Sequence, residues 1–148
     1  MTSLELMGIY IREFKKTDLK AFEPIETGVS SYDNEFAQAI EDSDLAVTGI
    51  KNGEIVLCGG VHPTENPEHG ELWLRLSRGC QKNKIETIRC LKEGLRIISD
   101  VFPFRQLNAI IKCDFAQSIR LIEFLGFSKT QELVFEGQKW SIFSKRVK

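Results

Sequence analysis

The feature that most constrains the fold is the change in apolar spacing along residues 82–127, where two helical segments alternate with a strand. From Ile85 to Ile98, apolar residues recur at steps of three and four, which is the spacing of an amphipathic helix. A strand-like run follows at residues 104–113 (FRQLNAIIKC), and residues 114–125 return to helical spacing. The sequence therefore predicts strand–helix–strand units rather than a helical bundle or an all-β sandwich.

The second of these helices has readable ends in the stretch CDFAQSIRLIEFLGF, residues 113–127. Asp114 can accept hydrogen bonds from the first free amides, and Gln117 can reach back to it as in a capping box. Gly126 stands where a left-handed residue ends a helix, and Phe127 can pack back on the last turn. We expect a well-capped helix over residues 114–125.

Further elements surround this pair. A strand is expected at residues 9–14, a short helix capped by Thr17 at residues 17–24, and a second helix at residues 33–43. Asn-Gly at residues 52–53 predicts a hairpin, ELWLRLS (residues 71–77) a strand, and Glu-Gly at residues 136–137 a final hairpin.

The expected fold class is α/β (α+β), with one domain over residues 1–148. The predicted order is β-α-α-β-β-β-α-β-α-β-β, with a mixed central sheet of about seven strands and helices on both faces. Basic residues in the final hairpin are expected to protect an outer edge of the sheet: Lys139, Lys145 and Arg146.

Composition excludes several classes of function. The formal net charge of −1 gives no global argument for binding nucleic acid or an anionic membrane. The four cysteines form no CxxC pair, so no metal site is predicted. No apolar run approaches the ~18 residues that span a bilayer, and the start MTSLELMGIY lacks the pattern of a signal peptide. We expect synthesis in a reducing cytoplasm.

Charge is distributed unevenly along the chain. Residues 23–44 contain seven acids and no base, whereas residues 78–92 contain five bases and one acid. Ordinary solvation explains such a surface. The alternative is that the acidic region engages a basic host partner, through residues such as Glu35, Glu41 and Asp42.

The predicted order, together with SIRLIEFLGF after the fifth strand, resembles the GCN5-related N-acetyltransferase (GNAT) fold. In that family this helix follows a splayed strand pair and closes one side of the acetyl-CoA cleft. Its usual ending is similar to D-N-x-x-A-I-x-L-Y-E-K-L-G-F. The positions matched here are Asp114, Ile119, Leu121, Glu123 and residues 125–127.

A narrower resemblance is to the GNAT-like internal core (internal virion) proteins of short-tailed bacteriophages. The similar stretches are TDLKAFEP, the W-x-L strand at residues 73–76, SIRLIEFLGF and the closing GQKWSIF. This resemblance implies a phage protein that assembles the virion interior without established catalysis. It also implies other phage or host proteins as partners, with a homo-oligomer as a further option, and a location in the host cytoplasm or the virion.

The GNAT resemblance places a phosphate-binding loop, normally Q/R-x-x-G-x-G/A, at SRGCQKNK (residues 77–84). Glycines there let helix amides approach the pyrophosphate. This chain offers only Gly79, and it has Ile122 where the family has a proton-donating Tyr and Phe115 where it has an Asn. If acetyl-CoA binds, the resemblance implies contacts from Leu76, Arg78, Gly79, Gln81, Lys82, Lys84 and Asp114.

For the general base, the resemblance favours Glu71, with His62 and His69 flanking the preceding loop. Ser77 and Cys80 have no histidine at meaningful spacing, so nucleophilic catalysis has little support. Besides a host-directed binder that uses the acidic region to mimic nucleic acid or to engage a basic partner, two main hypotheses remain from the sequence. The first is a non-catalytic GNAT-fold phage assembly factor with a degraded cofactor site and no cofactor. The alternative is an active acetyl-CoA-dependent N-acetyltransferase acting on a small amine or a protein amino group.

Overall fold

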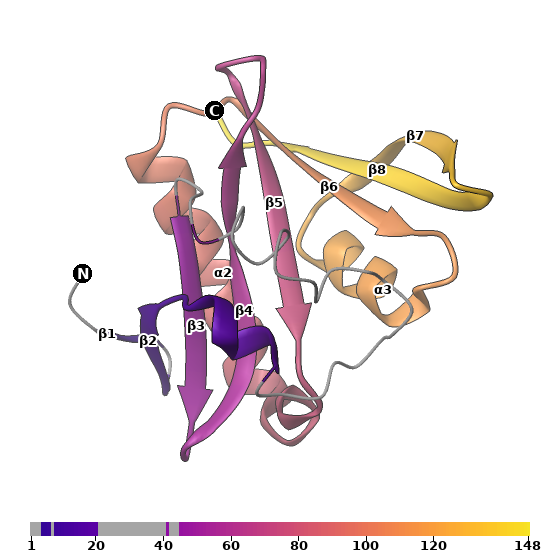
Figure 1. Ribbon diagram of the computed structural model, residues 1–148. Helices are drawn as coiled ribbons and strands as arrows, with labels where there is room; N and C mark the ends of the chain where they lie inside the picture. Colours follow the sequence, from indigo (N-terminus) through magenta and orange to yellow (C-terminus); the bar gives the residue numbers. More distant parts are fainter. Residues whose placement is uncertain (1–3, 7, 21–40, 42–44) are drawn as a thin grey trace. The chain divides into compact units, whose positions relative to one another are not determined.

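Figure 1 shows a computed structural model of the chain, which describes residues 4–6, 8–20, 41 and 45–148. The strands are β1 Leu4–Leu6, β2 Ile9–Glu13, β3 Leu45–Lys51, β4 Glu54–Pro63, β5 His69–Leu76, β6 Gln106–Lys112, β7 Ser128–Phe135 and β8 Gln138–Arg146. The helices are α2 Lys84–Val101, α3 Ala116–Phe124, and two 3₁₀ helices at Lys16–Lys20 and Arg78–Asn83. Hydrogen bonds join the strands in the order β1-β2-β3-β4-β5-β6-β8-β7.

The chain divides into two compact units. Unit 1 comprises Met1–His62 and Trp73–Ile98, and unit 2 comprises Pro63–Leu72 and Ser99–Lys148. The expected α/β class with a mixed sheet is confirmed, since the sheet holds both antiparallel pairs and the parallel pair β5–β6. The expectation of one domain over residues 1–148 stays a prediction.

In unit 1, β1 to β4 pair successively in antiparallel fashion. The β3–β4 hairpin turns through Asn52 and Gly53, whose φ angles are 52° and 79°. Both central residues thus lie in the left-handed region, which is the conformation that Asn-Gly favours in a two-residue hairpin. The predicted hairpin is confirmed.

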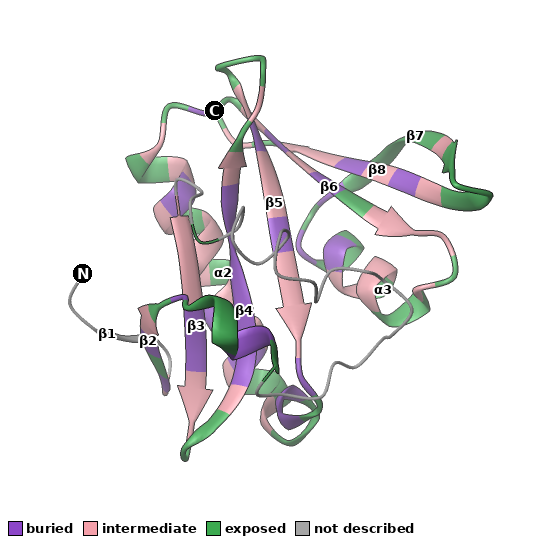
Figure 2. Ribbon diagram, in the orientation of Figure 1, coloured by how far each residue is buried: buried purple, intermediate pink, exposed green. Residues whose placement is uncertain are grey.

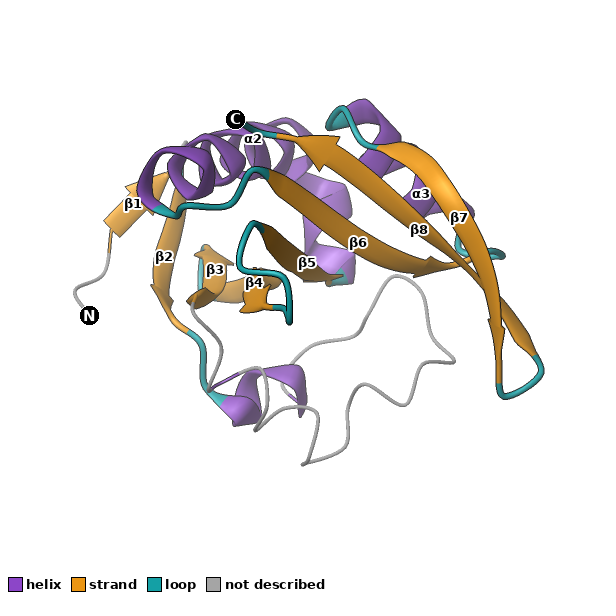
Figure 3. Ribbon diagram, turned by 90° about the horizontal axis from the view of Figure 1, so that it is seen from above, coloured by secondary structure: helices purple, strands orange, loops and turns teal. Residues whose placement is uncertain are grey.

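The sheet of unit 1 has a core on each face, with α2 on one side of β2–β4 and the first 3₁₀ helix on the other (Figure 3). On the α2 side the buried residues are Ile9, Ile11, Val56, Leu57, Cys80 and Cys90. The other cluster contains Phe14, Leu19, Cys58 and Trp73. The rings of Phe14 and Trp73 meet edge to face, with centroids 5.5 Å apart. β4 contributes to both clusters and is buried over most of its length (Figure 2).

A buried carboxylate ties the first 3₁₀ helix to the sheet. Asp18, only 4% exposed, accepts two hydrogen bonds from the Arg12 guanidinium at 2.8 and 2.9 Å. It also accepts bonds from the Lys15 amide (2.9 Å) and the Thr48 hydroxyl (2.7 Å). Burial opposes ionisation of Asp18, but these donors outweigh it and lower the pKa of the carboxyl below its ordinary value.

In unit 2, β6 pairs in parallel with β5 through residues 69–71, and β8 lies between β6 and β7. Alternate residues of β6 and β8, among them Leu107, Ala109 and Phe143, are buried. α3 contributes Ile122 and its C-cap contributes Leu125 to the buried set of this unit. The Lys145 ammonium donates to the Leu125 carbonyl oxygen (2.9 Å), which joins β8 to the end of α3.

The end of α3 agrees with the sequence. Gly126 has φ 97°, and the amides of Gly126 and Phe127 donate to the carbonyl oxygens of Glu123 and Ile122 at 3.0 and 3.1 Å. This is the Schellman arrangement that a glycine at this position permits. The Glu136-Gly137 hairpin is confirmed as well, with positive φ at both residues.

Several local expectations were wrong. The N-cap of α3 is Phe115, which makes no side-chain cap, so the predicted capping box at Asp114 and Gln117 does not form. The first helix is a 3₁₀ helix that begins at Lys16, so Thr17 lies inside it rather than capping it. The final hairpin does form an outer edge of the sheet, as expected, but its three basic residues lie on the internal strand β8 and not on the edge strand β7. The predicted helix at residues 33–43 lies outside the described residues apart from Glu41.

Asp18→Asn should lower the free energy of unfolding by about 3 kcal/mol, because it leaves the Arg12 guanidinium without its buried partner. Urea denaturation followed by circular dichroism at pH 7 measures this. Glu13→Gln, an equal charge change at an exposed position of β2, is the control and should change stability by less than about 0.5 kcal/mol. Equal effects of the two variants would contradict the structural role of Asp18.

The same carboxylate predicts a pH dependence. Because the pKa of Asp18 is lowered in the folded state, its contribution is complete above the unfolded-state pKa of about 3.9 and is lost as the pH falls towards the folded value. The stability difference between the wild type and Asp18→Asn should therefore be largest near neutral pH and shrink as the pH falls below about 4. A difference that stays constant over this range would contradict the assignment.

Gly60 on β4 and Gly94 in α2 form a matched pair for alanine substitution. A Cβ at Gly60 would lie 1.9 Å from the Leu45 carbonyl oxygen, so the backbone must move, whereas a Cβ at Gly94 would meet no atom within 4 Å. Gly60→Ala should destabilise the protein by more than about 3 kcal/mol, and Gly94→Ala should stabilise it by about 0.5–1 kcal/mol. Thermal unfolding of both variants measures the contrast, and similar midpoints would refute it.

Candidate functional site

The segment between β5 and α2, which carries most of the predicted cofactor residues, is anchored by Ser77. The Ser77 amide donates to the Val56 carbonyl oxygen (3.1 Å), and the Ser77 hydroxyl donates to that of Ile55 (2.5 Å). The same hydroxyl accepts the Gly79 amide at 3.1 Å, which makes Ser77 the N-cap of the 3₁₀ helix Arg78–Asn83. Ser77 therefore fixes the start of the helical segment against the first residues of β4.

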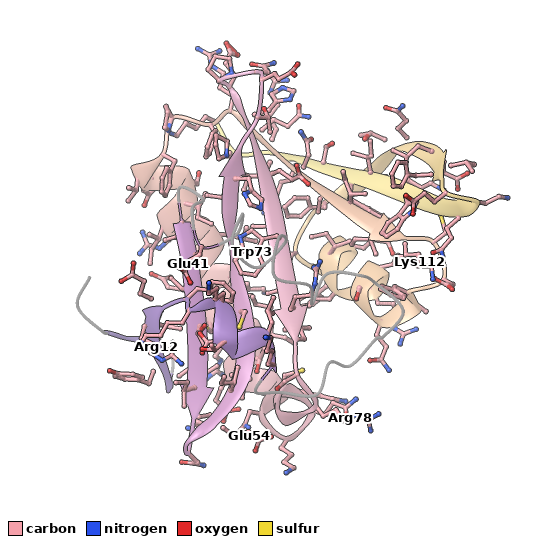
Figure 4. The ribbon with its side chains drawn as sticks, in the orientation of Figure 1. Arg12, Glu41, Glu54, Trp73, Arg78 and Lys112 are labelled. Atoms are coloured by element: carbon pink, nitrogen blue, oxygen red, sulfur yellow. The ribbon has the colours of Figure 1, made fainter. Side chains whose placement is uncertain are left out.

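This anchoring gives Gly79 surroundings unlike a phosphate cradle. Its amide is already satisfied by Ser77, and a Cβ at Gly79 would lie 2.6 Å from the Glu54 carboxylate oxygen. Glu54 and Arg78 lie at the same end of unit 1 (Figure 4). The space beside the only glycine of this segment therefore contains a carboxylate, which repels an anion.

The backbone in front of α2 is helical rather than open. The 3₁₀ helix runs directly into Lys84, the first residue of α2, and the Asn83 side chain donates to the Gly79 carbonyl oxygen at 3.0 Å. The positive charge of this segment is on the surface, because Arg78, Lys82 and Lys84 are exposed. An anion can therefore meet lysine and arginine side chains here, at the positive end of the α2 dipole.

Leu76 and Gln81 complete the set predicted in this segment. Leu76 ends β5 and packs against the α2-side cluster of unit 1, whereas the side chain of Gln81 is exposed. Unit 1 therefore brings together six of the predicted cofactor residues: Leu76, Arg78, Gly79, Gln81, Lys82 and Lys84.

The buried thiols of unit 1 are poor nucleophiles. Burial raises the pKa of Cys58 to about 12 and the pKa of Cys80 and Cys90 to about 11. These thiols are therefore protonated at neutral pH, and a thiol is far less nucleophilic than a thiolate. The hydroxyl of Ser77 is occupied by its capping role.

The predicted acid–base residues lie on or near β5. Glu71 is half-buried and pairs with Asn108 of β6. The Nδ1 atom of His69 lies 3.4 Å from the Asn108 side-chain nitrogen. His62 lies in unit 1, where its ring centroid is 6.5 Å from that of Trp73. Glu71 and His69 thus share unit 2, and His62 does not.

The remaining predicted positions are on α3 and just before it. Asp114 is exposed, and its carboxylate lies 3.8 Å from the Lys112 ammonium, which also lies over the Phe115 ring at 5.5 Å (Figure 4 labels Lys112). Ile122, at the position of the family's proton-donating Tyr, is buried. Asp114 therefore does not cap α3, and Ile122 offers no proton.

Sequence reasoning missed two residues that shape these regions. Glu54 is 25 positions before Gly79, and the pairing of β4 with β5 and the bonds from Ser77 to Ile55 and Val56 bring the two together. The one feature of the sequence that could have drawn attention to Glu54 is its position directly after the Asn-Gly turn. Nothing in the sequence indicated a role for Asn108, because a single amide in an apolar strand does not show which strands will lie on either side of it.

Within the described part of the chain, no group of three or more His, Cys, Asp or Glu side chains could hold a metal ion. Likewise, no helix in the described ranges is long and apolar enough to cross a membrane.

No known protein-family model matches the sequence, and no curated protein matches it. Solved structures do match. A GNAT-family acetyltransferase from Bacillus anthracis is similar with a TM-score of 0.72 and 13% identity, covering 99% of both chains. A ribosomal-protein-S5-alanine acetyltransferase from Vibrio fischeri has a TM-score of 0.69 and 13% identity, covering 99% of this chain and 97% of its own.

A spermidine N-acetyltransferase chimera from Vibrio cholerae is also similar, with a TM-score of 0.72 and 10% identity over 95% of this chain and 96% of its own. Nothing in these comparisons links the chain to phage internal core proteins. Identities of 10–13% establish architecture and leave activity open. Over nearly its whole length, the chain has the fold of the GNAT acetyltransferases.

Proposed function

We propose that this protein is an acetyl-CoA-dependent N-acetyltransferase that acts on a small amine or a protein amino group. The observation that carries the proposal is the likeness of almost the entire chain to proteins named as acetyltransferases. Two of those names specify different acceptors, spermidine and the alanine of a ribosomal protein. The acceptor of this chain therefore has to be argued from its own residues.

At the start of α2, the charged side chains are better suited to bind an anionic cofactor than the backbone amides are. Exposed Lys82 and Lys84, with Arg78 beside them, supply positive charge for the phosphates. The Gly79 amide donates to Ser77, and the position of a Cβ at Gly79 faces the Glu54 carboxylate, so this glycine supplies no cradle. Binding on this surface would depend on the lysine and arginine charges.

Acetyl-CoA supplies an acetyl group activated as a thioester. In the transfer, the amine nitrogen bonds to the acetyl carbon, the carbon–sulfur bond breaks, and the electron pair leaves with the sulfur. Glu71 is the candidate to accept the proton that the amine loses. Buried Ile122 has no proton to return to the sulfur, so we assign this proton to water.

A second candidate function is a GNAT scaffold that performs no transfer. It is favoured by the carboxylate beside Gly79, the absence of a second glycine in residues 77–84, and the apolar residues Phe115 and Ile122. In this case the protein serves as a phage virion core or assembly factor, binds phage or host proteins or further copies of itself, and needs no cofactor.

Calorimetric titration with acetyl-CoA separates the two candidates. Under the transferase proposal the wild type binds acetyl-CoA, and Lys82→Glu weakens binding by about five- to tenfold, because one cation at the phosphate surface becomes an anion. The control is Arg89→Glu, an equal reversal at an exposed position further along α2, which should bind within about twofold of the wild type.

Release of free thiol from acetyl-CoA in the presence of amine acceptors then measures transfer. Wild-type protein that binds no acetyl-CoA at about 1 mM, a concentration that detects even weak complexes, would overturn the transferase proposal and favour the scaffold. If the protein binds acetyl-CoA but releases no thiol with any amine acceptor, the result would favour a scaffold that has kept its cofactor surface.

A further inference from the structure

A group of polar side chains crosses three strands of unit 2 on one face of the sheet. The cross-strand pairs are His69 with Gln106, Glu71 with Asn108, and Asn108 with Ser144. Paired residues of neighbouring strands project on the same face, and residues two apart on one strand share that face. All five side chains therefore lie on the face opposite to buried Leu107 and Ala109.

Asn108 lies at the centre of this group and its amide is held in one orientation. Its Oδ1 atom accepts hydrogen bonds from the Ser144 hydroxyl at 2.7 Å and from the Gln106 Nε2 atom at 2.8 Å. An amide oxygen has two lone pairs, and both are used here. The Asn108 nitrogen is therefore turned to His69, whose Nδ1 atom lies 3.4 Å away.

This orientation decides the protonation pattern of His69. The amide nitrogen can only donate a hydrogen bond, so Nδ1 of His69 must accept it. A neutral imidazole carries one proton, which then has to be on Nε2. The backbone of His69 is held as well, because its amide donates to the Asn66 carbonyl oxygen (3.0 Å) and its carbonyl oxygen lies 2.9 Å from the Thr64 hydroxyl.

We propose that Asn108 is a positioning residue that holds His69 as the Nε2–H tautomer and makes its ring a hydrogen-bond donor beside Glu71 for the acceptor substrate. The inference rests on the proposed acetyl transfer. With Nδ1 engaged by Asn108, His69 is not the proton acceptor, and that role remains with Glu71. The two residues lie about 7 Å apart along β5, on the same face.

A carboxylate beside a fixed N–H donor selects a particular class of acceptor. The carboxylate suits an ammonium group, and the donor suits an oxygen close to it. The first residue of a peptide carries both, because its carbonyl oxygen is next to the amino group. Spermidine carries amines and no oxygen. The acceptor class is therefore the amino terminus of a peptide or protein rather than a polyamine.

The tautomer can be tested without any enzymatic activity. The chain has two histidines, so long-range ¹H–¹⁵N spectra of the labelled protein, taken at a pH where both rings are neutral, resolve His69 with His62 as an internal reference. The wild type should show the Nε2–H form of His69. Asn108→Asp keeps acceptors for Ser144 and Gln106 but presents a carboxylate to Nδ1, and it should convert His69 to the Nδ1–H form.

The matched control is Gln131→Glu, the same amide-to-acid change at an exposed position of β7, which should leave the His69 spectrum unchanged. A wild-type ring in the Nδ1–H form, or a tautomer mixture that Asn108→Asp does not alter, would overturn the positioning role. This result stands whether or not the protein transfers acetyl groups.

Steady-state kinetics with acetyl-CoA test the donor role and the acceptor class, using an alanine-initiated peptide and spermidine. His69→Phe should raise KM for the peptide about tenfold, the effect of one lost hydrogen bond, with kcat changed less than about threefold. His69→Gln, whose amide nitrogen can donate in place of Nε2, should restore KM to within about threefold of the wild type.

Spermidine should be the poorer acceptor, and neither substitution should change its kcat/KM. If His69→Phe and His69→Gln lower kcat/KM equally with both acceptors, the ring acts by packing and not as a donor. Turnover of spermidine but not of the peptide would overturn the acceptor class. Failure to acetylate either acceptor would instead count against the proposed function and the acceptor class together. The positioning of His69 would still be decided by the spectra.

Discussion

The three hydrogen bonds of Ser77 determine what the start of α2 can do. Two of them attach Ser77 to Ile55 and Val56 on β4, and the third satisfies the Gly79 amide. Because β4 begins at Glu54, attaching the end of β5 beside it also brings the Glu54 carboxylate to Gly79. The character of the predicted cofactor segment therefore follows from how Ser77 is anchored to β4 and not from the glycine itself. Charge on nearby side chains is the remaining means of holding an anion there.

The sequence predicted those elements whose signals are local. The apolar spacing of α2, the Asn-Gly turn at residues 52–53 and the Gly126 end of α3 each depend on a few neighbouring residues. The start of α3 was misjudged for a physical reason. Asp114 has a favourable capping side chain, but the Lys112 ammonium lies 3.8 Å from its carboxylate, and the N-cap is one residue later, at Phe115. This competing contact comes from a residue only two positions away, and helix and capping propensities do not take such a contact into account.

The candidate site was predicted less completely, because its members become neighbours only through strand order. Residues 76–84 are contiguous, so their grouping was visible in the sequence. Asn108, Ser144 and His69 are separated by dozens of residues, and the hydrogen bonds among them depend on β8 pairing with β6 and β6 with β5. Glu71 gained its polar neighbour Asn108 in the same way. Resemblance could suggest Glu71, but it could not show which residue would orient the histidine beside it.

The likeness to acetyltransferases at 10–13% identity is physically reasonable, since the residues that maintain the fold differ from those that would perform the chemistry. The fold depends on backbone ladders, on the apolar clusters of unit 1 and on the buried Asp18–Arg12 pair. None of these requires a second glycine before α2 or a tyrosine at position 122. The residues of the cofactor site can therefore change without loss of the fold. The fold does not require the group of polar side chains on β5, β6 and β8 either. An apolar sheet face would pair equally well, so an Asn108 whose amide oxygen accepts two hydrogen bonds and whose amide nitrogen faces His69 is better explained by a use for that ring than by stability alone.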